Sequence, residues 1–144
     1  MANRYCGFGE KKKIVKAVAT AIEGISGVVF VDYQRAYDTG IGPEKMPGGF
    51  VNDIRNDREQ ILVDIVKNTL SIGVVLWTRA AEGEILWDKI DTLVNAATAA
   101  IRADPSLGSQ TYDVEISRVE SDNGSRHPVG VTVLILTAVY YSEV

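Results

Sequence analysis

The sequence predicts an α+β fold, a mostly antiparallel sheet of about five strands with two helices packed on one face. Two amphipathic patterns indicate the helices, one over residues 10–23 and one from Leu86 to about Asp104. Short runs rich in β-branched and aromatic residues indicate the strands. The length of 144 residues and the hydrophobic content of 46% fit a single domain spanning residues 1–144.

The first helix carries one apolar stripe. Its apolar side chains recur at three- and four-residue steps: Ile14, Val15, Val18, Ile22 and Ile25. Gly24 stands where a left-handed C-terminal cap is common, so we expect the helix to end there. Residues 28–33 are rich in valine and follow Gly27, which predicts the first strand.

A long loop is predicted at about residues 34–60. Glycine and proline are dense in its first half, and residues 52–59 are almost all charged or amide side chains. A loop of this length in a compact domain usually carries function. We therefore place a candidate assembly interface on it: Tyr37, Ile41, Met46, Phe50, Arg55, Asp57 and Arg58. Replacing residues 41–50 by a short Gly-Ser linker should change the free energy of unfolding by under about 1 kcal/mol, because closure entropy varies slowly with loop length.

Two strands are predicted next, at residues 61–66 and 71–79, with residues 67–70 as the hairpin turn. The second helix then shows its own apolar stripe: Leu86, Ile90, Leu93, Ala97 and Ile101. Pro105 disfavours helical geometry at the preceding residue, so this helix should stop at Asp104.

A second hairpin is predicted at the end of the chain. Residues 112–117 alternate between apolar and polar side chains, which is typical of a strand with one solvated face. Asn123 and Gly124 form a favoured turn pair. Residues 131–141 are apolar on both alternating faces, so this strand should be central in the sheet or covered by a partner.

No reactive or metal-binding constellation stands out. Cys6 is the single cysteine and His127 the single histidine, so an internal disulfide is impossible and a structural zinc site is not expected. No dinucleotide or phosphate-loop motif is present, and the net charge of −4 gives no general reason to expect nucleic-acid binding. No run reaches the length of a membrane span. We therefore expect neither a cofactor, nor enzymatic activity, nor a membrane partner.

The order of elements resembles the tail-terminator proteins of long-tailed bacteriophages, also called tail-completion or minor tail proteins. The first helix leading into residues 28–33 carries the resemblance, together with the block at residues 86–141. In that block, the stretch AIRADPSLG runs into TYDVEI, and the chain closes on a long strand ending in VYY. The resemblance covers most of the chain in order and pattern.

The resemblance implies a structural virion protein that forms a hexameric ring. Such a ring caps the growing tail tube and then joins it to the neck of the head, so the partners would be other copies, the tail tube protein and a neck or connector protein. It also implies passive contact with DNA in the ring lumen, assembly in the host cytoplasm and a final place at the tail–neck junction.

Three other functions fit the same sequence. Neck and head-completion proteins share its size and character. A small α+β binding or regulatory domain could dimerise through its sheet, giving two subunits rather than six. An enzyme could use residues 34–60 as a lid, which would require a pocket with convergent carboxylates of perturbed pKa.

Overall fold

The computed structural model describes residues 9–33, 46–104, 107, 111, 113–121 and 128–144. The helices are α1 (Lys11–Glu23) and α2 (Leu86–Ala103), and the strands are β1 (Phe30–Tyr33), β2 (Gly48–Gln60), β3 (Ile65–Arg79), β4 (Asp113–Ser121) and β5 (Val129–Glu143). The five strands form one sheet in the order β1-β2-β3-β5-β4. β1 runs parallel to β2, and the other neighbours are antiparallel. The predicted α+β class is confirmed.

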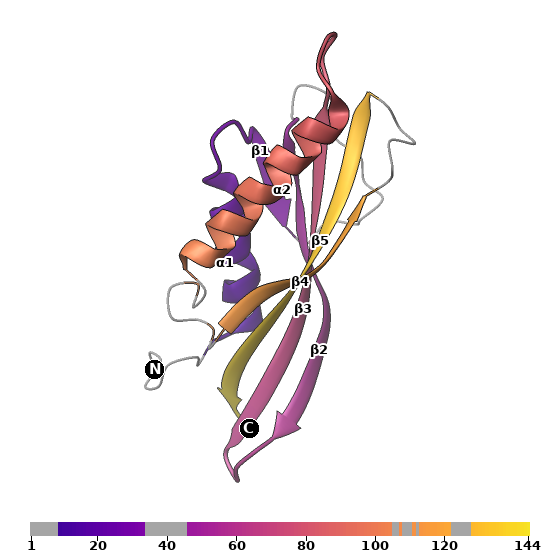
Figure 1. Cartoon of the computed structure of the whole chain (residues 1–144). Helices are drawn as coiled ribbons and strands as arrows, with labels where there is room; N and C mark the ends of the chain where they lie inside the picture. The colour runs from indigo at the N-terminus through magenta and orange to yellow at the C-terminus, as the bar shows by residue number, and fades with distance from the viewer. Residues whose placement is uncertain (1–8, 34–45, 105–106, 108–110, 112, 122–127) are drawn as a thin grey trace.

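Both helices pack on one face of the sheet (Figure 1). The apolar stripe predicted for α2 is the set of residues that the helix buries, and α1 buries Ile14, Val15, Val18 and Ile22 as expected. Leu86 and Ile90 pack with Ala80 at the start of α2. The other buried residues of the two helices share one core with Leu70, Ile72, Val74 and Leu76 of β3 and Leu134, Leu136, Ala138 and Tyr140 of β5. These strand residues alternate along the chain, so each central strand sends every second side chain toward the helices. As predicted, the last strand is central, between β3 and β4.

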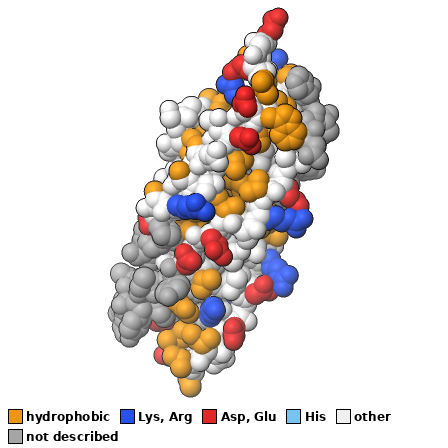
Figure 2. Space-filling view, in the orientation of Figure 1, with side chains coloured by type: hydrophobic (Ala, Val, Ile, Leu, Met, Phe, Trp, Pro, Cys, Tyr) orange, Lys and Arg blue, Asp and Glu red, His pale blue; other side chains and the backbone are white. Residues whose placement is uncertain are grey.

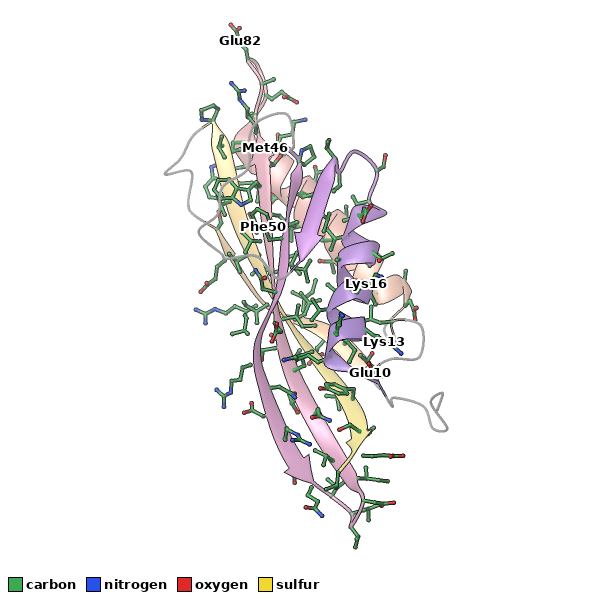
Figure 3. The ribbon with its side chains drawn as sticks, turned by 180° about the vertical axis from the view of Figure 1, so that it is seen from behind. Glu10, Lys13, Lys16, Met46, Phe50 and Glu82 are labelled. Carbon is green, nitrogen blue, oxygen red and sulfur yellow. The ribbon has the colours of Figure 1, made fainter. Side chains whose placement is uncertain are left out.

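The opposite face of the sheet holds a second apolar cluster. Phe50 of β2 lies opposite Val75 of β3, and Trp77 lies two residues further along. All three are buried, and Met46 packs against them. Figure 3 marks Met46 and Phe50 on the upper half of the sheet, and Lys13 and Lys16 along α1. The sheet therefore buries apolar side chains on both of its faces over this half.

The loop predicted at residues 34–60 is wrong for its second half, which is strand β2. Residues 34–45 lie outside the described residues. Position 49 of this strand requires glycine, because a Cβ there would lie 1.9 Å from the carbonyl oxygen of Val75. Since Phe50 is wholly buried, the expectation that residues 41–50 can be replaced at almost no cost is also wrong.

The hairpin predicted at residues 61–79 is wrong as well. β3 runs without interruption from Ile65 to Arg79, and the predicted turn at residues 67–70 lies inside it. Asn68 is 2% exposed there, and its amide donates to the hydroxyl of Ser142 at 2.9 Å. The actual hairpin joins β2 to β3. The polar residues 67–69 had indicated a turn. In the structure Asn68 is buried, and its hydrogen-bond partner Ser142 lies on β5, which is distant in the sequence.

The helix α1 ends at Glu23, as predicted, but the left-handed cap predicted at Gly24 is wrong. Gly24 has φ −73, and its N–H donates to the carbonyl of Thr20 at 3.0 Å. The chain reverses three residues later at Gly27, which has φ +89. By contrast, α2 ends at Ala103, immediately before Asp104, as Pro105 predicted.

Candidate assembly interface

The β2–β3 hairpin extends past the two helices (Figure 1). Its end carries exposed apolar side chains. Ile61, Leu62 and Val63 are 44%, 59% and 90% exposed. The backbone of Val144, itself 71% exposed, donates to the carbonyl of Asp64 at 3.1 Å and so brings the last strand beside them. We call these four apolar residues the hairpin tip. Figure 2 shows hydrophobic side chains gathered at this lower end of the molecule. A contiguous exposed apolar group of this kind commonly marks a contact surface.

The turn at the tip has a defined backbone. The N–H groups of Ile61 and Leu62 donate to the carbonyl of Ile65 at 3.0 and 3.3 Å, and the N–H of Ile65 donates back to Leu62 at 3.4 Å. The side chain of Gln60 also donates to the carbonyl of Val63 at 3.1 Å. These bonds tie the turn to both strands, so the apolar side chains project from a fixed base.

A polar network joins the β2–β3 hairpin to the last strand. The amide of Asn56 on β2 donates to the side-chain oxygen of Asn68 and to the hydroxyl of Tyr140, both at 3.3 Å. Asn68 donates onward to Ser142 on β5. The network therefore spans β2, β3 and β5. Burial raises the pKa of the Tyr140 phenol, and the hydrogen bond from Asn56 offsets part of that effect.

Charged pairs line the free edges of the sheet. Arg55 and Asp57 form an ion pair on β2 at 3.0 Å, and Arg118 pairs with Glu120 on β4. All four side chains are more than half exposed. Pairs this exposed contribute little to folding stability, so their charges are available to a partner.

The predicted interface residues fall into three groups. Tyr37 and Ile41 lie outside the described residues. Met46 and Phe50 belong to the second apolar cluster, and the full burial of Phe50 makes it a support for the sheet rather than a surface contact. Arg55, Asp57 and Arg58 are exposed on β2. Arg58 pairs with Asn68, whose side chain points to the helix-covered face, so its side chain leaves the sheet on the opposite side from the other two.

The hairpin tip was not predicted from the sequence. Ile61, Leu62 and Val63 were expected inside a strand, where apolar side chains are ordinary. The available signal was Asp64, which follows three apolar residues and interrupts the run at a turn. A turn at Asp64 indicates a hairpin only if a strand precedes it, and residues 48–60 were not predicted as a strand.

A groove of about 670 Å³ lies at the other end of the molecule, between the segment after α1, the end of β3 and the start of α2. Its lining includes Ile25, Pro47, Ile85 and Leu93, together with Glu84, Asp88 and Lys89. The ion pair with Lys89 at 2.6 Å and the N–H of Ala81 lower the pKa of the Glu84 carboxyl. That lowering keeps Glu84 ionised, which is the behaviour of a surface ion pair rather than of a general acid.

Metal-binding chemistry has no support within the described part of the chain. In that part, no three His, Cys, Asp or Glu side chains gather closely enough to hold an ion. Cys6 and His127 fall outside it. Neither described helix is long and apolar enough to cross a membrane.

No protein-family model matches the sequence, and no curated protein matches it. Among solved structures, the chain is similar to one described as "Virion of native gene transfer agent (GTA) particle". The identity is 14% and the TM-score is 0.49, over 90% of this chain and 95% of that one. A likeness at that score assigns neither a family nor a function.

Proposed function

We propose that this chain is a structural virion protein that forms a ring on the end of a phage tail tube and joins the tube to the neck. The observation that carries the proposal is the hairpin tip, in which Leu62 and Val63 are 59% and 90% exposed at the end of a hydrogen-bonded hairpin. The order of elements, which resembles the tail-terminator family, supplies the identity of the partner.

A contact role explains the tip better than folding does. Burying Leu62 and Val63 would stabilise the chain by about 1.5–3 kcal/mol each, yet the fold leaves both in water. Stable interfaces bury such apolar centres and surround them with polar side chains. Glu59 and Asp64 are exposed on either side of the tip and would form that polar rim. We therefore assign the tip to the contact with the tail tube.

A tip substitution tests the assignment. Val63→Asp introduces a charge at the most exposed apolar side chain, and its matched control is Ile85→Asp, which is 60% exposed at the start of α2. Val63→Asp should melt like the wild type, and Ile85→Asp at least as high, because Ile85 is the N-cap of α2 and aspartate is favoured there. Rings should appear on the ends of tubes grown from the tail tube protein of the same genome with the wild type and the control. Val63→Asp should leave those ends bare in electron micrographs.

The mass of the purified chain separates the alternatives. Light scattering at high concentration should give a closed ring of about six copies, because cyclic assemblies close at fixed number. A mass of two subunits would instead favour a dimeric binding domain. Rings that bind only a neck protein, and never a tube end, would favour a neck or head-completion protein.

A further inference from the structure

Both outer edges of the sheet are free of a partner strand within the described residues. β1 pairs only with the first four residues of β2, Gly48 to Val51, so no strand among the described residues lies beside residues 52–60 on that edge. β4 pairs with β5 on its inner side and is the last strand of the sheet. That strand and the open stretch of β2 have the same length. An open edge presents unpaired N–H and C=O groups that another strand can satisfy.

The two edges run in directions that suit each other. β2, β3, β5 and β4 are successive antiparallel neighbours, so β2 and β4 point in opposite directions. When β4 of one copy is placed beside β2 of the next, the two strands are therefore antiparallel. Such a contact uses different surfaces on the two copies and can repeat around a ring.

The charges on the two edges lie on the same face of the sheet. Arg55 and Asp57 pair with Ser71 and Thr69, which alternate with the helix-facing residues of β3. Arg118 and Glu120 pair with Ile135 and Val133, which alternate with the helix-facing residues of β5. All four charged side chains thus leave the sheet away from the helices. Residues that face each other across an antiparallel pair share one face, so these four can meet.

The order of the charges fixes a register. On each edge an arginine is followed, two residues later, by an acidic residue. In an antiparallel pair the two strands run in opposite directions, so the arginine of one edge faces the acidic residue of the other. Arg55 then lies opposite Glu120, and Asp57 lies opposite Arg118. With the ion pairs already present within each strand, the four side chains form a square of alternating sign.

The same register accounts for two further features. Ser121, the last residue of β4, comes to lie beside Ile54 of β2. This position is just beyond Val51, the last β2 residue that pairs with β1. The added strand therefore follows β1 along the same edge without displacing it. Ile54 and Val119 are each 48% exposed, one on each edge, and they approach within two positions of each other.

From these observations we infer that the occupant of each edge is a second copy of this chain, joined by antiparallel pairing of β2 with the neighbour's β4 in the register that sets Arg55 opposite Glu120 and Asp57 opposite Arg118. The inference rests on the proposed function, because it supplies the contact between neighbours in the ring. Charges on an open edge often serve only to keep other strands away. Here the two edges are complementary rather than alike, which favours attraction between them.

Charge exchange within one strand tests the register. Arg55→Asp with Asp57→Arg keeps the net charge and the ion pair within β2, but it sets like charges opposite each other across the interface. Arg118→Glu with Glu120→Arg does the same on β4. Each doubly substituted chain should melt like the wild type, because all four side chains are exposed. Each should need at least about tenfold more protein to assemble, measured by light scattering.

Mixing the two variants provides the decisive measurement. In an equal mixture, every exchanged β2 edge can meet an exchanged β4 edge, and every natural edge can meet a natural one, so alternating rings should form again. The quadruply substituted chain should also assemble alone. Variants that assemble like the wild type, or an equal mixture that does not recover, would overturn the edge pairing while leaving a wild-type ring intact. A wild type that forms no ring would overturn both this inference and the proposed function.

Discussion

The backbone of Gly49 lies against the carbonyl group of Val75 so closely that a Cβ on Gly49 would stand 1.9 Å from the carbonyl oxygen. The two residues lie on neighbouring strands, where Gly49 pairs with Leu76. Gly49→Ala therefore requires β2 and β3 to separate locally. We expect it to lower the free energy of unfolding by about 3 kcal/mol or more, since overpacking against backbone cannot be relieved by side-chain rotation. Urea unfolding followed by circular dichroism measures the loss.

Gly130 provides the matched control. A Cβ there would lie 2.7 Å from Cδ1 of Ile90, 3.1 Å from its Cγ1 and 3.2 Å from Cδ1 of Leu86, all of them side-chain atoms of α2. Ile90 can rotate away, and alanine costs less chain entropy than glycine. Gly130→Ala should change the free energy of unfolding by no more than about 1 kcal/mol. A loss as large as that of Gly49→Ala would show that the contact with Val75 is not what requires glycine.

The same glycine explains why β2 was not predicted from the sequence. Glycine is depleted in strands, so Gly48 and Gly49 were interpreted as loop residues. The polar residues that follow were interpreted in the same way. In the structure they belong to a strand that continues past α1, where residues 57–60 are exposed and need no apolar side chains. A pattern of alternation cannot reveal a strand without a buried face.

The second helix and the last strand were predicted well. The stripe of α2 was predicted residue by residue because one side of that helix meets the sheet. The central position of β5 followed from side chains that are apolar on both faces. In the candidate interface, Arg55 and Asp57 were identified as exposed charges, but their match with Arg118 and Glu120 depends on strand order, which the sequence does not provide.

Phe50 should be the most costly side chain to truncate on the face away from the helices. It is 0% exposed and packs with Val75 and Trp77. Phe50→Ala should lower the free energy of unfolding by about 3–5 kcal/mol, through lost burial and the cavity that remains. Arg55→Ala on the same strand should change it by under about 0.5 kcal/mol, because that side chain is exposed. Equal effects in urea unfolding would contradict the assignment of Phe50 to the core.

The ion pair between Lys11 of α1 and Asp53 of β2 should contribute little to stability. Its atoms are 3.3 Å apart, but the two side chains remain 49% and 35% exposed. Solvent screens such a pair, so Asp53→Asn should cost about 0.2–1 kcal/mol, and the cost should shrink in high salt. A double-mutant cycle with Lys11→Met measures the coupling. A coupling that is large and independent of salt would contradict this expectation.

The buried phenol of Tyr140 should make the chain less stable at high pH. Burial raises its pKa in the folded state, so the unfolded chain loses this proton first as the pH rises. The contribution is fully present below the unfolded pKa of about 10 and is lost as the pH rises toward the folded pKa. Over that window the free energy of unfolding should fall by up to about 1.4 kcal/mol per pH unit through this group.

Tyr140→Phe isolates that contribution. The substitution removes the acceptor for Asn56, so the variant should be about 1 kcal/mol less stable at neutral pH. It also removes the titrating group, so its stability should decline less steeply above pH 10 than that of the wild type. The two curves of unfolding free energy against pH should therefore converge in alkaline solution. Curves that stay parallel from neutral to alkaline pH would show that the phenol of Tyr140 ionises equally readily in the folded and unfolded chains.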